Sequence, residues 1–221
     1  MGGQSVAPLE DRMWGNQESI VNTARALVNT PFSPLVERIQ QEATVENDRI
    51  LKIDHFLNHR IEPAFMAAMG NALAERIAPF KPDLLLTAEA SGIAPALATA
   101  MALDLPLVYA KKYAPIVEPP ALSRIVPSPT KGGETRLVVG ARYLPSNTRV
   151  ALVDDFLANG RTALALAEII GDAGAETVVA GFLVEKMFQQ GRTALEERRI
   201  PIVALAQVAR LEAGRVIMAE A

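Results

Sequence analysis

Five short apolar runs, separated by segments with helical spacing, constrain the fold of this chain of 221 residues more than any other feature. Residues 84–86 are three consecutive leucines, as expected of a strand that is buried on both faces of a sheet. We expect strands over residues 84–86, 107–110, 149–153, 177–184 and 202–206, a short extended run at 50–53, and helices over 35–43, 61–77, 93–103 and after Gly160 through Ile170. Strands that alternate with helices need right-handed crossovers, so the pattern predicts an α/β fold with a parallel, twisted sheet flanked by helices.

Residues 1–34 differ from the rest of the chain because they are rich in polar residues and are broken by prolines. Helical spacing within them is limited to one set of apolar residues, Ile20, Ala24, Leu27 and Val28. We therefore divide the chain into an N-terminal helical arm, residues 1–34, and a single domain, residues 35–221. The arm is either a mobile or packing segment, which is the simpler interpretation, or a segment that embraces a second subunit.

Composition excludes several classes of protein and site. The chain has no cysteine, which rules out disulfides and cysteine-based metal sites and is compatible with the cytoplasm. Its only histidines are His55 and His59, too few for a site built from several histidines. The formal net charge of −3 argues against a nucleic acid as the main partner. No apolar stretch reaches the roughly 18 residues of a membrane span, so we expect no membrane partner.

Residues 113–135 interrupt the alternating pattern with five prolines and a Gly-Gly pair. A loop of this length is uncommon in a compact domain and is often a lid over an active site. A β-hairpin over one edge of the sheet is the alternative, and the two are compatible because a hairpin can itself be the lid.

The segment 150–162 carries the strongest chemical signal in the sequence. Four apolar residues are followed by Asp154 and Asp155, and a loop of small residues then opens into a helix. The loop amides and the positive end of the helix dipole form a cradle for an anion, and Gly160 allows the backbone to approach a phosphate closely. The two carboxylates have the wrong charge for phosphate but suit hydroxyl groups or a divalent cation. The segment therefore points to a sugar phosphate, unless Asp155 is simply a helix cap.

This segment resembles the phosphoribosyl pyrophosphate (PRPP) motif of type I phosphoribosyltransferases, an apolar strand with two acids and a small loop that ends in Gly-x-Thr. Asn159 stands where the broad family commonly has threonine, and Phe-Leu-Ala-Asn-Gly after the acids resembles the xanthine branch. Residues 51–59, 87–95 and 184–192 resemble that branch's base-side segment, pyrophosphate loop and purine-contacting strand end. The match begins near residue 35, so the first 34 residues lie outside it.

The resemblance implies the type I phosphoribosyltransferase fold with a small hood formed by residues 113–135. It implies transfer of phosphoribosyl from PRPP to xanthine, giving XMP and pyrophosphate in purine salvage, by a homodimer. Mg²⁺ would arrive with PRPP rather than in a dedicated protein site, with Asp154 and Asp155 as its candidate protein contacts. The alternatives are hypoxanthine, guanine or adenine as the base, or a PRPP-sensing regulatory protein that binds nucleic acid.

The resemblance also assigns roles to individual residues. Asp154 and Asp155 are the catalytic pair, which binds the ribose hydroxyls and stabilises positive charge on the sugar. The residues implied for PRPP are Ala158, Asn159, Gly160, Arg161 and Thr162 at the 5′-phosphate, and Glu89, Ala90, Ser91, Gly92, Lys111 and Lys112 at pyrophosphate. The residues implied for the purine are Leu51, Asn58, Lys186 and Phe188. In the family the turn at residues 89–92 is sometimes strained by a cis peptide, and the alternative is an ordinary turn with Ser91 as helix cap.

Overall fold

The computed structural model describes residues 30–112, 120–127 and 133–219. A six-stranded sheet with the order β10-β9-β8-β7-β3-β4 forms its centre. Its strands are β3 (Leu84–Ala88), β4 (Leu107–Ala110), β7 (Arg149–Leu157), β8 (Glu176–Lys186), β9 (Ile202–Glu212) and β10 (Arg215–Met218). Only the β10–β9 pair in this sheet is antiparallel, so the expected α/β fold with a mostly parallel sheet is confirmed.

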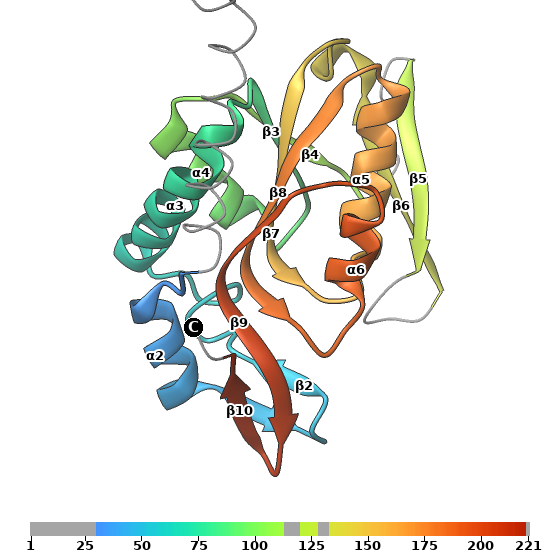
Figure 1. Cartoon of the computed structure of the whole chain (residues 1–221). Helices are drawn as coiled ribbons and strands as arrows, with labels where there is room; N and C mark the ends of the chain where they lie inside the picture. Colours follow the sequence, from blue (N-terminus) through green and yellow to red (C-terminus); the bar gives the residue numbers. More distant parts are fainter. Residues whose placement is uncertain (1–29, 113–119, 128–132, 220–221) are drawn as a thin grey trace, which may run out of the picture.

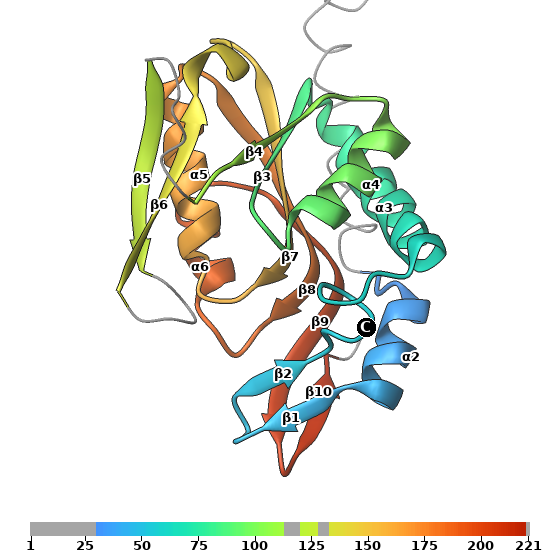
Figure 2. The same cartoon turned by 180° about the vertical axis from the view of Figure 1, so that it is seen from behind.

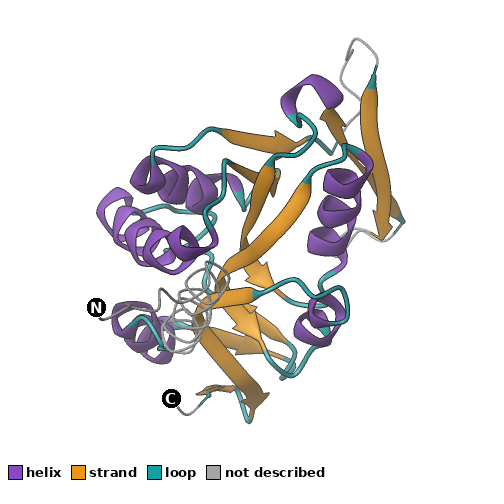
Figure 3. Ribbon diagram, turned by 45° about the horizontal axis from the view of Figure 1, so that its top comes forward, coloured by secondary structure: helices purple, strands orange, loops and turns teal. Residues whose placement is uncertain are grey.

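Helices cover both faces of the sheet (Figure 1). On one face lie α3 (Pro63–Ile77) and α4 (Ile93–Leu103), and on the other lie α5 (Arg161–Asp172) and α6 (Gly191–Glu196). Successive strand residues point to opposite faces, so in β7 Ala151 and Val153 pack on the α3 side while Val150 and Leu152 pack on the α5 side. Figure 3 shows the strands as a layer between the two groups of helices.

Several expected elements are longer than the sequence pattern indicated, including β3, β8 and β9, which ends at Glu212 rather than at residue 206. The strand expected at 149–153 continues to Leu157, because its backbone keeps pairing with β8 through Asp154 and Phe156. The two aspartates therefore lie within the strand rather than after it. The helix expected to end at Ile170 continues to Asp172, and the turn beyond it is made by Gly174 with φ +73°.

A small lobe lies beyond the carboxyl ends of β7 and β8 (Figure 2). It consists of α2 (Ser33–Glu42), β1 (Thr44–Glu46), β2 (Ile50–Lys52) and β10. The Phe32 N–H donates to the Leu205 carbonyl over 2.7 Å, which ties the lobe to the sheet. Helix α2 crosses the boundary expected between residues 34 and 35. The helix expected around residues 20–28 lies outside the described residues.

The interrupted segment contains an antiparallel hairpin of β5 (Ala121–Pro127) and β6 (Glu134–Gly140). It packs beside α5, where Arg124 contacts Asp172 at 2.6 Å, and Lys111 bridges the end of β4 to β6 at Val138. The expectation of a hairpin at the sheet edge is thus confirmed. Residues 113–119 and 128–132 lie outside the described residues, so the lid stays a prediction.

Two short 3₁₀ turns, η1 (Ala78–Phe80) and η2 (Ala141–Tyr143), complete the elements that the structure describes. Among the helices of this part of the chain, none has the length and apolar character needed to cross a bilayer.

Candidate functional site

A cavity of about 550 Å³ opens at the carboxyl ends of β3 and β7. It brings together the acid pair, the small loop and the turn after β3, with a lysine from the end of β4 and one from the end of β8. The predicted residues that line it are Glu89, Ser91, Lys112, Asp154, Asp155, Ala158, Asn159, Gly160, Arg161, Thr162 and Lys186. Ligands of parallel α/β sheets bind at this edge, so the cavity is the candidate active site.

The loop at residues 158–160 joins β7 to α5, and with Arg161 and Thr162 in the first turn of α5 it has the geometry of an anion cradle. Gly160 immediately precedes the helix and has φ +74°, a left-handed conformation that side chains other than glycine rarely adopt. The N–H of Gly191, the first residue of α6, donates to the Ala158 carbonyl over 2.9 Å and holds the loop against that helix. The free N–H groups in the first turn of α5, together with its dipole, suit a phosphate.

In the acid pair Asp155 is buried and Asp154 is partly buried, and their hydrogen bonds are formed within the site. Asp154 Oδ1 accepts the N–H of Asp155 at 2.9 Å, and Asp155 Oδ1 accepts the N–H of Phe156 at 3.0 Å. Asn58 Nδ2 donates to Asp155 Oδ2 over 2.7 Å, which brings the base-side segment to the acid pair. Asp155 thus lies in β7 and does not cap α5, so the helix-cap interpretation is wrong.

The pKa of Asp154 is raised well above its usual value, mainly because burial disfavours the carboxylate and further because the Asp155 carboxylate lies beside it. Asp154 and Asp155 can accept from ribose hydroxyls, and as oxygen ligands they suit Mg²⁺. No group of three or more potential metal ligands is found within residues 30–112, 120–127 and 133–219.

The turn after β3 contains a cis peptide bond between Glu89 and Ala90. The N–H of Lys112 donates to the Glu89 carboxylate, which joins the turn to the end of β4. Gly92 is the residue that precedes α4, and no side chain caps that helix, so the interpretation of Ser91 as N-cap is wrong.

Gly92 lies directly against the acid pair. A Cβ at this position would collide with Thr87 Oγ1 and Asp154 Oδ1. The Thr87 hydroxyl is fully buried and has no hydrogen-bond partner in the described part of the chain. Only glycine therefore leaves room for the Asp154 carboxylate where the structure places it.

The predicted purine residues are not all brought together. Lys186 lines the cavity, and its Nζ lies 4.9 Å from the centroid of the Phe156 ring. Burial lowers the pKa of Lys186, and the Asp155 carboxylate opposes that change. Phe188 is 40% exposed and Leu51 is buried in the core, and neither lines the cavity.

Phe156 is the aromatic residue that sequence reasoning did not single out. It follows the acid pair directly, and with Phe182 of β8 it supplies the aromatic rings of the cavity lining. Its position in an alternating strand was the available signal, but the strand was expected to end at residue 153.

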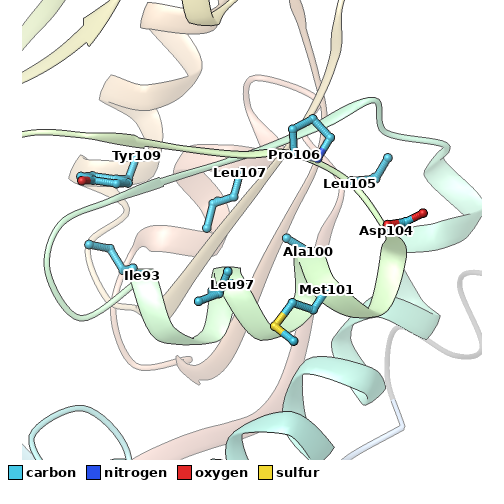
Figure 4. A pocket seen from close by; sticks show the side chains of 9 residues that line it. All are labelled: Ile93, Leu97, Ala100, Met101, Asp104, Leu105, Pro106, Leu107 and Tyr109. Carbon is cyan, nitrogen blue, oxygen red and sulfur yellow. The ribbon is translucent and has the colours of Figure 1, made fainter.

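A second hollow, of about 620 Å³, lies between the outer side of α4 and β4 (Figure 4). Its lining is apolar except for the Asp104 carboxylate and the Tyr109 hydroxyl, and Leu97, Met101 and Tyr109 are exposed. It presents no cationic side chain to a phosphate, so it does not compete with the first cavity for the ligand that the sequence predicts.

Comparison with known proteins agrees with the geometry of the site. The family model of the phosphoribosyl transferase domain matches residues 55–203. A xanthine phosphoribosyltransferase of Chloroflexus aurantiacus is 58% identical over 188 residues, which cover 85% of this chain and 89% of that protein. A second, from Deinococcus deserti, is 42% identical and covers 85% of this chain and 97% of its own length.

Solved structures of adenine phosphoribosyltransferases have the same fold. That of Rhodothermus marinus superposes with a TM-score of 0.65 at 22% identity, covering 80% of this chain and 99% of that one. That of Trypanosoma brucei, in complex with AMP, pyrophosphate and ribose-5-phosphate, has a TM-score of 0.66 at 18% identity and covers 79% of each chain.

Proposed function

The chain belongs to the phosphoribosyltransferase family, and from that premise we propose that it transfers the phosphoribosyl group of PRPP to xanthine, giving XMP and pyrophosphate. The observation that carries the proposal is one cavity in which two adjacent aspartates lie beside a glycine loop at a helix N-terminus. The similarity to xanthine phosphoribosyltransferases over 85% of the chain supports xanthine as the base.

In the proposed reaction, the amides of residues 158–162 bind the 5′-phosphate and the two aspartates accept from the ribose hydroxyls. The bond from C1 of the ribose to pyrophosphate breaks, a ring nitrogen of the purine bonds to C1, and the purine loses a proton. Positive charge develops on the sugar as the leaving group departs. Fixed carboxylates at Asp154 and Asp155 stabilise that charge without reorganising.

Pyrophosphate leaves toward Glu89 and Ser91 of the turn after β3 and toward Lys112, which line the same cavity as the glycine loop. The oxygens of Asp154 and Asp155 fit Mg²⁺, which keeps few protein ligands and is commonly held through substrate phosphates. Bound with PRPP, the ion supplies positive charge that offsets the charge of the leaving pyrophosphate.

Lys186 is the proposed determinant of oxo purines, because its ammonium can donate to an exocyclic oxygen but meets the amino group of adenine unfavourably. Replacing Lys186 with Met should lower kcat/KM for xanthine by about 10- to 100-fold, since a hydrogen bond from a charged group is lost. Steady-state kinetics with xanthine and adenine measure both the loss and the reduced preference. An unchanged ratio between the two bases would remove Lys186 from base selection.

Asn58 is the proposed determinant of xanthine over hypoxanthine. Its amide nitrogen donates to Asp155, and its carbonyl oxygen can accept from a purine N–H. Asn58→Ala should therefore reduce the ratio of kcat/KM for xanthine to that for hypoxanthine, as measured by competing the two bases for PRPP. Unchanged selectivity would show that Asn58 serves only to orient Asp155.

The experiment that tests the function is a panel of xanthine, hypoxanthine, guanine and adenine with PRPP and Mg²⁺, followed through pyrophosphate release. We expect xanthine to be the preferred base. Preference for another base would reassign the substrate within the same family. Binding of nucleic acid without turnover of any base would support the PRPP-sensing regulator instead.

We further propose that residues 1–34 form an arm outside a catalytic domain of residues 35–221, and that the enzyme acts as a homodimer in the cytoplasm. The family match, from residue 55 to 203, lies within the proposed domain, and α2 begins at Ser33, two residues before its proposed boundary. Sedimentation equilibrium of the whole chain and of a chain that lacks residues 1–29 would measure the dimer and the arm's contribution to it.

A further inference from the structure

Glu185 is a fully buried carboxylate at the end of β8, directly before Lys186, and its side chain is 1% exposed. Three N–H groups satisfy it. Arg192 Nε and Nη2 donate to its two oxygens over 2.6 Å each, and Gln207 Nε2 donates over 2.8 Å. This bidentate contact fixes the orientation of Arg192 as well as its distance from Glu185, because the planar guanidinium matches the carboxylate.

The pair joins the two ends of one turn. Glu185 precedes residues 187–190, and Arg192 is the second residue of α6. Lys186 lies at the start of this turn, and its carbonyl accepts the N–H of Gln189 at 3.0 Å. A shift of α6 relative to β8 would therefore also move the backbone that carries Lys186.

The same end of α6 touches the phosphate loop. Gly191 donates its N–H to the Ala158 carbonyl over 2.9 Å, and its Cα lies 3.0 Å from the place that a Cβ on Gly160 would occupy. Leu157 packs directly against Gly191, and a Cβ on Gly191 would lie only 2.6 Å from Leu157 Cδ1. The loop at residues 158–162 and the turn at residues 187–190 thus meet at a single residue.

We propose that Glu185 and Arg192 form a positioning pair that holds the phosphate loop and the Lys186 turn at the separation that one nucleotide requires. The inference deepens the proposed function and rests on it. A pair that only stabilised the fold could be exchanged for apolar side chains without loss of binding, because buried ion pairs replaced in this way are often no less stable. A positioning pair could not, because apolar side chains lack its directional contacts.

The test compares Arg192→Met with the double variant Glu185→Met/Arg192→Met. The single variant leaves Glu185 buried without its main partner and should lower the melting temperature sharply. The double variant should recover much of that temperature, since Gln207 is partly exposed and can be hydrated. Its KM for PRPP and its KM for xanthine should nevertheless both rise about tenfold, as expected for groups displaced by a fraction of an ångström.

A matched control lies at the opposite ends of the same strands. Arg149 of β7 pairs with Glu176 of β8 at 3.3 Å, on the edge away from the cavity. Arg149→Met should leave both KM values unchanged. If the double variant does not regain stability, Arg192→Lys takes its place in the test, because lysine keeps the positive charge but cannot make the bidentate contact.

If a stably folded variant keeps the wild-type KM for PRPP and for xanthine, then Glu185 and Arg192 form only a structural contact and the inference is overturned. A rise in KM for xanthine alone would overturn the link through Gly191 to the phosphate loop. Failure of the proposed function is separate, because it would appear as a wild-type protein that does not turn over xanthine. The pair would then still be tested by the calorimetric affinity for PRPP, which should fall in the double variant and not in Arg149→Met.

Discussion

Asp154→Asn is expected to abolish most of the transfer activity and at the same time to raise the free energy of unfolding at neutral pH. The activity falls because the carboxylate that stabilises the developing charge on the ribose is lost, which we expect to cost about 10²- to 10³-fold in kcat. The stability rises because burial, and then the neighbouring Asp155, penalise the ionised form of Asp154 in the folded protein.

The sign follows from proton linkage. The pKa of Asp154 is higher in the folded protein than in the unfolded chain. At pH values between these two pKa values, the folded protein therefore binds more protons than the unfolded chain. The wild type therefore loses stability as pH rises from the usual aspartate pKa through the raised folded-state pKa, and this loss persists at neutral pH. Asparagine carries no such charge, so the loss should be absent from the variant.

Melting temperatures measured from acidic to mildly alkaline pH, together with kcat, check both effects. Asp104→Asn is the matched control, because Asp104 is exposed and has φ +53°, a conformation that asparagine tolerates. The control should change neither quantity. Full activity in Asp154→Asn, or a lower melting temperature at neutral pH, would contradict the prediction.

Gly92→Ala is expected to reduce kcat by about a hundredfold, because the added methyl group displaces the Asp154 carboxylate. Neither neighbour can move away cheaply. Thr87 is fully buried and stiff at χ1, and Asp154 is the group on which catalysis depends. Overpacking at this point should also destabilise the protein by about 1–3 kcal/mol.

Gly171→Ala provides the control for the same chemical change. Gly171 lies within α5, and a Cβ there would meet nothing within 4 Å. This variant should keep full activity and gain about 1 kcal/mol, because alanine is the better helix former. Chemical denaturation and steady-state kinetics on both variants separate crowding at the site from the general effect of an added methyl group. A Gly92→Ala enzyme with wild-type kcat would show that Asp154 tolerates displacement.

The central fold could be predicted because parallel strands are buried on both faces and appear as continuous apolar runs. The expected bounds of α4 and β4 agree with the structure to the residue. The predicted strand β7 was shorter than the observed one, because the apolar run ends at the aspartates while the backbone continues to pair with β8. Strands β1 and β10 were missed, because each forms an antiparallel pair that an alternation of parallel strands and helices does not indicate.

From the residue pattern alone, the site could be predicted only where its parts are contiguous in the sequence. The family resemblance was needed to add Glu89, Ser91, Lys112 and Lys186, which line the same cavity. Asp154, Asp155 and the loop that follows lie in one segment, so their proximity needed no tertiary information. The contact between Asn58 and Asp155 joins residues 97 positions apart, and the collision that would follow a Cβ on Gly92 depends on how β3 lies against β7. Local patterns carry no record of such approaches. The roles of Leu51 and Phe188 at the purine stay predictions.

The small lobe imposes an order on how the protein is made. Its segments α2, β1 and β2 emerge early from the ribosome, but β10, which contacts α2 and β1, emerges only after the whole central sheet has been translated. Strands β1 and β2 can already pair with each other, but α2 and β1 lack the strand that packs on them until then. A nascent chain that stalls before residue 215 would carry the glycine loop and the acid pair, yet its base-side lobe would lack the strand against which it packs.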